Sequence, residues 1–568
     1  MTTDPTPLET LHERLLWLSC WTIHNANHLR EKSDVKVGGH QASSASMAAI
    51  LTALYFHVLR PEDRVAVKPH AAPVFHAIQY LAGRQSLEKL KAFRGWGGAQ
   101  SYPSRTKDVD DVDFSTGSVG LGAAMPIFAS MVQDYVAGHG WGREKLGRMV
   151  ALIGDAELDE GNIYEALQEG WKHDIRNVWW VIDYNRQSLD GVVREGLWAR
   201  IEAIFGAFGW RVERLKYGVI QRAAFAEPGG EALRDWIDAC PNALYSALTY
   251  QGGGAWRARL MSDLGDQGEV SALIDRRDDG ELARLMENLG GHCLASLCDA
   301  FDAIDDDRPT VFLAYTVKGW GTPLAGHKDN HAGLMTPAQM EGYRKAMRVE
   351  EGEEWEPFRA SDDAKALKRQ IAEAPFFRAG ARRYSAPVLP APGPVELADE
   401  ELSTQAGFGK IMDSIARAGG PLSDRIVTMS PDVTVSTNLG GWVNRRGLFA
   451  RDARADTFRD ERVASAQKWA FSPAGQHVEL GIAEMNLMLM LGAAGLSHSL
   501  FGERLIPVGT VYDPFVARGL DALNYACYQD ARFMLIGTPS GVTLAPEGGA
   551  HQSIGSPLIG VAQDGLAS

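Results

Sequence analysis

Two short apolar runs in the first third of the chain each end abruptly in polar residues. Residues 149–153 (MVALI) lead into Gly-Asp, and residues 178–182 (VWWVI) lead into Asp-Tyr-Asn. The stretch between them carries four apolar side chains near helical spacing, namely Ile163, Ala166, Leu167 and Trp171. The pattern predicts a buried strand, an amphipathic helix and a second buried strand, joined as one right-handed parallel crossover.

The polar residues that follow the two predicted strands include Asp155 and Asn185. Parallel sheets bind ligands beyond the carboxyl ends of their strands, so both side chains are expected at one sheet edge. A carboxylate and an amide carbonyl are hard oxygen ligands that suit Mg²⁺ or Ca²⁺, and a diphosphate would complete the shell of such an ion. The helix expected near Gly161 would present its N-terminus to that anion. Alternatively, Asp155 caps this helix and Asn185 forms a turn, and the spacing alone does not decide between the two interpretations.

The length of 568 residues is too great for one ordinary core, so at least two domains are expected. A proline-rich segment at 385–401 predicts an extended linker. It separates a domain at 1–384 from a second domain at 402–568. Within the first domain, the glycine-rich and charged stretch 212–300 predicts inserted loops or surface helices.

Composition narrows the class of protein. The formal net charge is 57 − 72 = −15, which argues against a broad surface for nucleic acid. Five cysteines without a CxxC pair indicate reduced thiols. The N-terminus lacks the basic and apolar regions of a secretory signal, and the longest apolar stretch is too short to span a bilayer. We therefore expect a cytoplasmic protein with no nucleic-acid and no membrane partner.

The string GDAELDEG, followed by NVWWVIDYNRQSLDG, resembles the thiamine diphosphate motif. It looks like the homodimeric type of pyruvate dehydrogenase decarboxylating component and, more distantly, like transketolase. Further strings continue this resemblance in order, among them KVGGHQASS (36–44), VKPHAAPVFHA (67–77), STGSVGLGAAMP (115–126), VKGWG (317–321), GHKDNHAG (326–333), VELGIAEMN (478–486) and TPSGVTLAPEGGAHQ (538–552). The resemblance implies an α/β fold with two doubly wound parallel-sheet domains, both transketolase-like, and the cofactors thiamine diphosphate and Mg²⁺.

The resemblance also implies the residues that bind these cofactors. The Mg²⁺ ligands would be Asp155, Asn185 and Gln187. The wider set of cofactor contacts would be His70, Ser118, Gly120, Gly154, Asp155, Ala156, Glu157, Asn185, Tyr512 and Phe515. Gly117, Gly120 and Gly122 are interpreted as sites of close backbone approach to the diphosphate or to a helix.

Glu484 is the acid that the resemblance assigns to cofactor activation. A carboxylic acid bonded to the aminopyrimidine ring favours the imino tautomer, whose nitrogen can remove the thiazolium proton. We expect the neighbouring Ile482, Met485 and Leu487 to raise the pKa of Glu484 by desolvation. The alternative is an ordinary glutamate on the surface of an amphipathic helix.

Histidines form the second set of catalytic candidates. Those in family-like motifs are His40, His70, His331 and His551, with His327 as a weaker candidate. Each would donate a hydrogen bond to a developing alkoxide or move a proton at the substrate. Glu547 precedes His551 by four residues and is expected to share a helical face with it. Asp432 is a further acid expected at the substrate end.

Three departures from the family pattern affect this interpretation. Ala156 stands at the third position of the usual Gly-Asp-Gly, and Asp183 replaces the usual Asn before the ligand pair. A carboxylate at 183 is unfavourable unless it faces away or pairs with a cation. The chain also stops seventeen residues after His551. We therefore expect a fragment, half of a split enzyme or a shortened relative, with the C-terminal third domain absent; expressed alone, it should aggregate or decarboxylate weakly.

The preferred function implied by the resemblance is decarboxylation of a 2-oxo acid, with pyruvate as the first choice. The acyl unit would pass to a lipoyl group on a partner acyltransferase, and the chain would form a homodimer. An alternative is transketolase-type ketol transfer between sugar phosphates, which requires a basic pocket; Arg105, Arg445 and Arg446 are candidates for it. A non-catalytic chain that binds the cofactor and needs a partner to complete the site is a third possibility.

Overall fold

A computed structural model of the chain describes residues 5–31, 37–142, 145–188, 191–378, 380–397 and 401–563. The chain divides into two compact units. Unit 1 comprises residues 1–117, 150–159 and 179–380, and unit 2 comprises residues 118–149, 160–178 and 381–568. Parallel β-sheets form the centre of both, so the predicted α/β fold with two parallel-sheet domains is confirmed.

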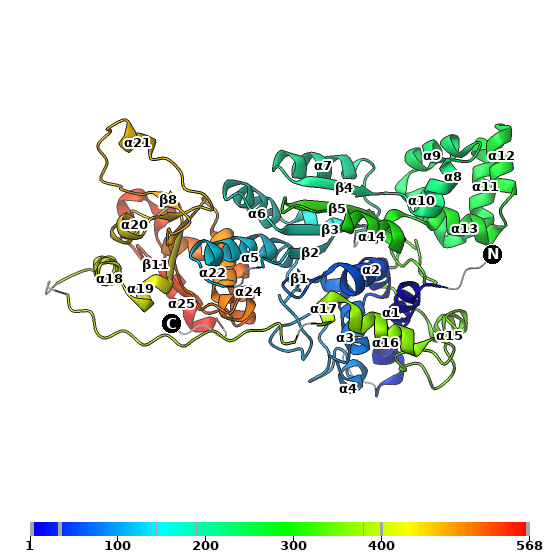
Figure 1. Cartoon of the computed structure of the whole chain (residues 1–568), viewed down its shortest axis with the longest axis horizontal. Helices are drawn as coiled ribbons and strands as arrows, with labels where there is room; N and C mark the ends of the chain where they lie inside the picture. Colours follow the sequence, from blue (N-terminus) through cyan, green and yellow to red (C-terminus); the bar gives the residue numbers. More distant parts are fainter. Residues whose placement is uncertain are drawn as a thin grey trace. The chain divides into compact units, whose positions relative to one another are not determined.

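The first sheet has the strand order β1-β2-β3-β5-β4 (Figure 1). Its strands are β1 (Arg64–Ala66), β2 (Met149–Gly154), β3 (Val178–Tyr184), β4 (Arg211–Leu215) and β5 (Thr310–Tyr315). Strands β2 and β3 are buried along their whole length and correspond to the two apolar runs of the sequence. β4 pairs in parallel with β5 at the edge of the sheet, inside the stretch for which only loops or helices were expected.

Helices surround the strands of unit 1. They are α1 (Pro7–His24), α2 (Gln41–Ala53), α3 (Ala72–Leu81), α4 (Leu87–Lys91), α7 (Leu197–Ala207), α8 (Val219–Phe225), α9 (Gly230–Ala239), α10 (Asn242–Gln251), α11 (Gly253–Leu264), α12 (Gly268–Asp275), α13 (Asp279–Glu287), α14 (Leu294–Asp302), α15 (Pro337–Ala346), α16 (Ala364–Glu373) and α17 (Pro375–Arg378). Helices α8 to α13 form the predicted insertion. One hydrophobic core joins α1, α2 and α3 to strands β2, β3 and β5, and therefore holds the ends of these strands in place.

The second sheet has the order β11-β10-β6-β9-β7-β8. Its strands are β6 (Ile426–Pro431), β7 (Leu448–Phe449), β8 (Phe471–Ser472), β9 (His477–Leu480), β10 (Ile506–Val511) and β11 (Met534–Gly537). The helices of unit 2 are α5 (Leu121–Gly138), α6 (Gly161–Lys172), α18 (Thr404–Ala418), α19 (Pro421–Arg425), α20 (Gly440–Arg446), α21 (Thr457–Asp460), α22 (Glu484–Gly495), α23 (Ser497–Leu500), α24 (Leu520–Tyr528) and α25 (Ser556–Ala562).

Helix α22 is the central helix of unit 2. Nearly all of its residues are buried, because it packs on β6 and β10 as well as on helices α5, α6 and α24. Helix α6 forms where the sequence predicts it, but Trp171 is 55% exposed and does not belong to its buried face. The buried face instead uses Gly170, whose absent Cβ leaves room for Ile175.

The proline-rich segment has neither helix nor strand over residues 385–397, and residues 398–400 lie outside the described part of the chain. Among the helices that the structure describes, none is both long enough and apolar enough for a transmembrane segment.

Candidate cofactor site

The three predicted metal ligands lie together where two strands of unit 1 end. Asp155 directly follows β2, and Asn185 directly follows β3; both are buried. The Asp155 carboxylate accepts hydrogen bonds from the backbone N–H of Arg186 at 2.7 Å and of Ala156 at 2.9 Å. The Asn185 side-chain oxygen accepts one from the backbone N–H of Gln187 at 3.0 Å. These hydrogen bonds hold the Asp155 carboxylate and the Asn185 amide in fixed orientations.

Buried carboxylates outnumber buried ammonium groups at this corner, which consists of Asp155, Glu157, Asp183, Lys68 and Lys318. Burial, together with the negative charge of Asp183, raises the pKa of Asp155 to about 7. The side-chain oxygen of Gln187 is buried and accepts no hydrogen bond from the described residues. Hard oxygen donors and a buried oxygen that accepts no hydrogen bond from the described residues fit a divalent cation such as Mg²⁺.

Asp183 pairs with a cation, which is one of the two ways in which a carboxylate was expected to be tolerated at this position. Its Oδ2 lies 2.6 Å from Lys68 Nζ and accepts hydrogen bonds from Ser46 Oγ at 2.6 Å and Asn185 Nδ2 at 3.1 Å. The hydroxyl of Thr316 donates to Oδ1. Burial opposes ionisation, but Lys68 and the hydroxyl donors hold the pKa of Asp183 below its usual value.

Three of the candidate histidines form one cluster in unit 1. The ring centroids of His40 and His70 are 4.3 Å apart, and that of His331 lies 5.0 Å and 5.4 Å from them respectively. Lys318 Nζ lies 2.9 Å from His331 Nδ1, and His40 Nδ1 lies 3.0 Å from the His331 carbonyl oxygen. The three rings therefore point into one common space.

The histidine cluster is neutral at neutral pH. Burial lowers the pKa of His70 to about 2 and that of His331 to about 4, and the positive charges of Lys68 and Lys318 add to both shifts. The imidazole nitrogens are close enough together to hold a metal ion. The neighbouring lysines oppose a second cation, so the cluster is better suited to an anion or a polarised carbonyl oxygen.

His327 lies outside this cluster. Its ring packs edge-on against Tyr250 at 4.6 Å, and its Nδ1 accepts a hydrogen bond from the backbone N–H of Asp329. Two lysines, in contrast, belong to the site although sequence reasoning did not select them. Lys318 lies in the VKGWG string and Lys68 in VKPHAAP, so the available signal is that both lie in strings that carry the family resemblance.

Unit 2 carries the predicted close approach at a glycine. Gly120 has a φ of 83°, and a Cβ on it would lie 2.5 Å from Asn162 Oδ1 and 2.7 Å from Glu160 Cβ. Only glycine fits both the backbone conformation and the space. Ser118, two residues earlier, donates its hydroxyl to Asp521 at 2.8 Å. The loop before α5 is therefore tightly held.

Glu484 begins α22 and is 4% exposed. Its carboxylate accepts a hydrogen bond from Arg518 at 3.1 Å, so an ion pair covers it. The expectation that Ile482 desolvates Glu484 is wrong, because Ile482 is 72% exposed. Leu487 is buried in the packed part of α22. Asn486, in the first turn of α22, donates to the Glu165 carbonyl at 3.1 Å and helps to fix the start of the helix.

Aromatic rings and a histidine gather after strand β10. The rings of Tyr512 and Phe515 stack at 6.3 Å, and the ring of His551 lies 5.3 Å from that of Phe515. The expected helix shared by Glu547 and His551 is wrong, since two short 3₁₀ turns replace it. The two side chains nevertheless lie 3.7 Å apart. Asp432 follows β6, and its backbone N–H donates to Glu479 at 2.8 Å.

Comparison with known proteins gives the same assignment as the motifs. Residues 33–223 match the family model described as transketolase, thiamine diphosphate binding domain. The solved transketolase from Campylobacter jejuni aligns with 99% of this chain and 74% of its own, with a TM-score of 0.65 and 16% identity. The fold is transketolase-like.

The transketolase-like chain is also similar in sequence to pyruvate dehydrogenase E1 components. It is 27% identical to that of Mycobacterium tuberculosis, with 95% of this chain and 61% of the relative aligned. It is 27% identical to that of Pseudomonas aeruginosa, with 96% and 64% aligned. The chain thus spans about three fifths of the length of the curated relatives it matches, and the predicted resemblance is confirmed.

Proposed function

We propose that this chain takes part in thiamine-diphosphate-dependent decarboxylation of a 2-oxo acid, with pyruvate as the first substrate to test. The observation that carries the proposal is the arrangement of the predicted metal ligands. Asp155, Asn185 and Gln187 lie together at adjacent strand ends, inside the matched thiamine diphosphate binding domain. These residues would hold Mg²⁺, which in turn would hold the diphosphate. When bound, the cofactor supplies the electron sink for the breaking carbon–carbon bond.

The histidine cluster would act on the substrate. Because the Lys318 ammonium donates to Nδ1 of His331, the ring proton of His331 belongs on Nε2. That N–H is available to a carbonyl oxygen that gains negative charge, and His40 and His70 complete the polar wall around it. Lys68 and Lys318 give this wall a positive potential, which favours the carboxylate of a 2-oxo acid.

Glu484 would hold a proton at the pyrimidine end of the cofactor. The carboxyl group is fixed by the start of α22 and by Arg518, so it is pre-oriented for a hydrogen bond to a ring nitrogen. Tyr512 and Phe515, which stack on each other, supply an apolar wall of the kind that flat heterocycles prefer.

The finer parts of the proposal follow the names of the relatives, which are pyruvate dehydrogenase E1 components. We propose transfer of the acyl unit to a lipoyl group on a partner acyltransferase, a homodimer as the working assembly, and a cytoplasmic location. The charge balance of −15 supports a small-molecule substrate without a nucleic-acid partner.

The transketolase-type alternative needs cations that are free to bind a sugar phosphate. The candidate arginines are already engaged: Arg445 with Asp413 at 2.6 Å, Arg446 with Asp424 at 3.2 Å, and Arg105 with the Asp113 carbonyl. These contacts disfavour the alternative.

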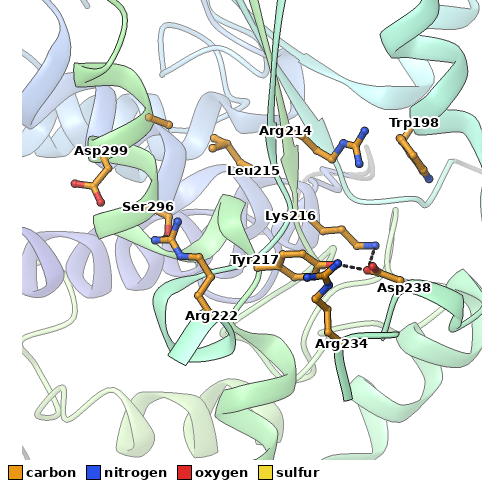
Figure 2. A pocket seen from close by; sticks show the side chains of 11 residues that line it. Trp198, Arg214, Leu215, Lys216, Tyr217, Arg222, Arg234, Asp238, Ser296 and Asp299 are labelled. Carbon is orange, nitrogen blue, oxygen red and sulfur yellow. Dashed lines mark hydrogen bonds and ion pairs between the residues drawn. The ribbon is translucent and has the colours of Figure 1, made fainter. Parts of the chain in front are cut away.

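A basic cavity of about 620 Å³ does exist in unit 1, after the edge strand β4 (Figure 2). Its cations are Arg214, Lys216, Arg222 and Arg234. Lys216 and Tyr217 both bond to Asp238, and none of the predicted site residues lines the cavity. It therefore offers no phosphate subsite beside the histidine cluster.

A paired assay tests the proposal. The full chain is supplied with thiamine diphosphate and Mg²⁺, and carbon dioxide release from pyruvate is measured with an artificial two-electron acceptor. A second reaction offers xylulose 5-phosphate and ribose 5-phosphate and measures ketol transfer. We expect carbon dioxide from pyruvate and no ketol transfer. The opposite result, or tight cofactor binding with neither reaction, would overturn the proposal.

A further inference from the structure

Lys68 and Asp183 form a buried ion pair next to the metal ligands. Lys68 lies directly beyond the short strand β1, and Asp183 lies on β3, two residues before Asn185. Both side chains are almost completely buried, and their charged atoms are 2.6 Å apart. A buried pair of this kind contributes little to net stability compared with apolar residues of similar size, so its presence calls for another role.

The hydrogen bonds of Asp183 suggest that role. The carboxylate accepts one bond from the nitrogen of the Asn185 amide at 3.1 Å, in addition to the bonds from Lys68 and Ser46. An amide has one nitrogen and one oxygen, so binding the nitrogen fixes the direction of the oxygen. Within the described part of the chain, the Asn185 oxygen accepts one hydrogen bond, from the Gln187 N–H, and a second lone pair remains for a cation.

Lys68 contacts the other ligand strand as well. A Cβ built on Gly154 would lie 3.2 Å from Lys68 Cε and 3.3 Å from its Nζ, so the lysine stem runs closely over the residue before Asp155. The ammonium neutralises Asp183, which would otherwise add an unpaired negative charge beside Asp155. The lysine thereby allows a carboxylate to be buried where it reaches the Asn185 nitrogen.

We propose that Lys68 and Asp183 are positioning residues that turn the Asn185 amide so that its oxygen, and not its nitrogen, faces the metal ion. This inference rests on the proposed Mg²⁺ site, but it concerns a pair that no ligand assignment includes. Partners that orient a ligand side chain commonly affect metal affinity by 10- to 100-fold when they are removed.

Two double variants separate orientation from charge. Lys68→Met/Asp183→Asn and Lys68→Met/Asp183→Leu both remove the ion pair, so each keeps the net charge of the corner. Asparagine and leucine side chains have the same number of heavy atoms and the same branching at Cγ, but only asparagine offers an oxygen to the Asn185 nitrogen. A third double variant, Arg359→Met/Asp362→Leu, removes another buried ion pair of unit 1, at 2.9 Å, and is the control.

Mn²⁺ affinity is measured in the full chain with thiamine diphosphate, from the electron paramagnetic resonance signal of free Mn²⁺. We expect the asparagine variant and the control to bind within about threefold of wild type, and the leucine variant to bind at least about tenfold more weakly. Equal affinities of the asparagine and leucine variants would overturn the inference, as would a tenfold loss in the control. If the leucine variant does not fold, as judged by circular dichroism, a tenfold loss in the asparagine variant alone decides against it.

Failure of this inference can be told apart from failure of the proposed function. A wild-type chain that releases carbon dioxide from pyruvate, with equal Mn²⁺ affinity in the two double variants, contradicts only the orienting role. Selective weakening in the leucine variant, in a chain without decarboxylase activity, supports the orienting role and contradicts the proposed activity.

Discussion

The two sheets end in polar residues of different character. At the end of the first sheet the charged groups are deeply buried and paired: Asp183 is fully buried, and Asp155 and Lys68 are 2% and 4% exposed. At the end of the second sheet, Glu484 is 4% exposed. Its partner Arg518 has a side chain that is 54% exposed, and the side chain of His551 is 31% exposed.

This difference follows from what each end must hold. Buried charges require counter-charges and hydrogen bonds, and a site built from them is rigid and selective for an ion. A half-exposed end with aromatic rings and one buried acid can accept a flat ring and exchange a proton with it. Changes to the predicted metal ligands at the first end should therefore affect cofactor binding, and changes to Glu484 at the second end should affect chemistry.

The largest effect is expected for Asp155→Ala. Loss of the one carboxylate among the three metal ligands should weaken Mg²⁺-dependent binding of thiamine diphosphate by at least about 100-fold. Quenching of the fluorescence of the 15 tryptophans measures this affinity. Asp159→Asn, an exposed change in the same GDAELDE string, is the matched control and should bind normally. Unchanged affinity in Asp155→Ala would show that the predicted metal ligands do not belong to the cofactor site.

Glu484→Gln tests the other end of the comparison. Glutamine keeps the shape and the contact with α22 but cannot exchange a proton, so hydrogen–deuterium exchange at the thiazolium carbon should fall by at least about 100-fold. Cofactor affinity should stay within about threefold of wild type. Exchange is followed by proton NMR after acid quench. Glu479→Gln, on the neighbouring β9, serves as control; wild-type exchange in Glu484→Gln would disprove its activating role.

His331→Ala should have a smaller effect than either of these two variants. We expect turnover to fall by about 10- to 100-fold with near-normal cofactor affinity, because His331 is placed to act on the substrate. His327→Ala is a close control, since this histidine lies four residues earlier and packs against Tyr250 instead of the cluster. If turnover and cofactor affinity fell together, His331 would have a structural role.

The sequence predicts the parts of the site whose signal is local. The runs 149–153 and 178–182 are apolar throughout and end in polar residues, so the strands and the positions of Asp155 and Asn185 can be inferred from hydrophobicity alone. Strand β4 cannot be inferred in this way. Its sequence, RVERL, alternates between polar and apolar residues like an exposed segment and forms a strand by pairing with β5. The order of the strands within each sheet is likewise a long-range property.

The charge partners in the site are not local. Lys68 and Asp183 are separated by 115 positions, and nothing in either segment indicates the other. The exposure of Ile482 also depends on tertiary packing, because the sequence around Glu484 is apolar on both sides. The motifs predict candidate site residues, whereas the fold shows that Lys68 and Asp183 neutralise one another.

The smallest predicted effect concerns pH and the histidines of the first end. Burial lowers the pKa of His70 to about 2 in the folded chain, against 6.5 when exposed, and the positive charges of Lys68 and Lys318 act in the same direction. The unfolded chain therefore takes up a proton below pH 6.5 that the folded chain does not, so stability should fall as pH is lowered from 6.5 towards 4. At pH 5.5, one pH unit below the unfolded pKa, the loss due to His70 is at most about 1.4 kcal/mol. His70→Asn should make the dependence of the urea midpoint on pH shallower between pH 7 and 5, with His551→Asn in unit 2 as the control. An unchanged slope in His70→Asn would mean that the first end is more open to water than its burial indicates.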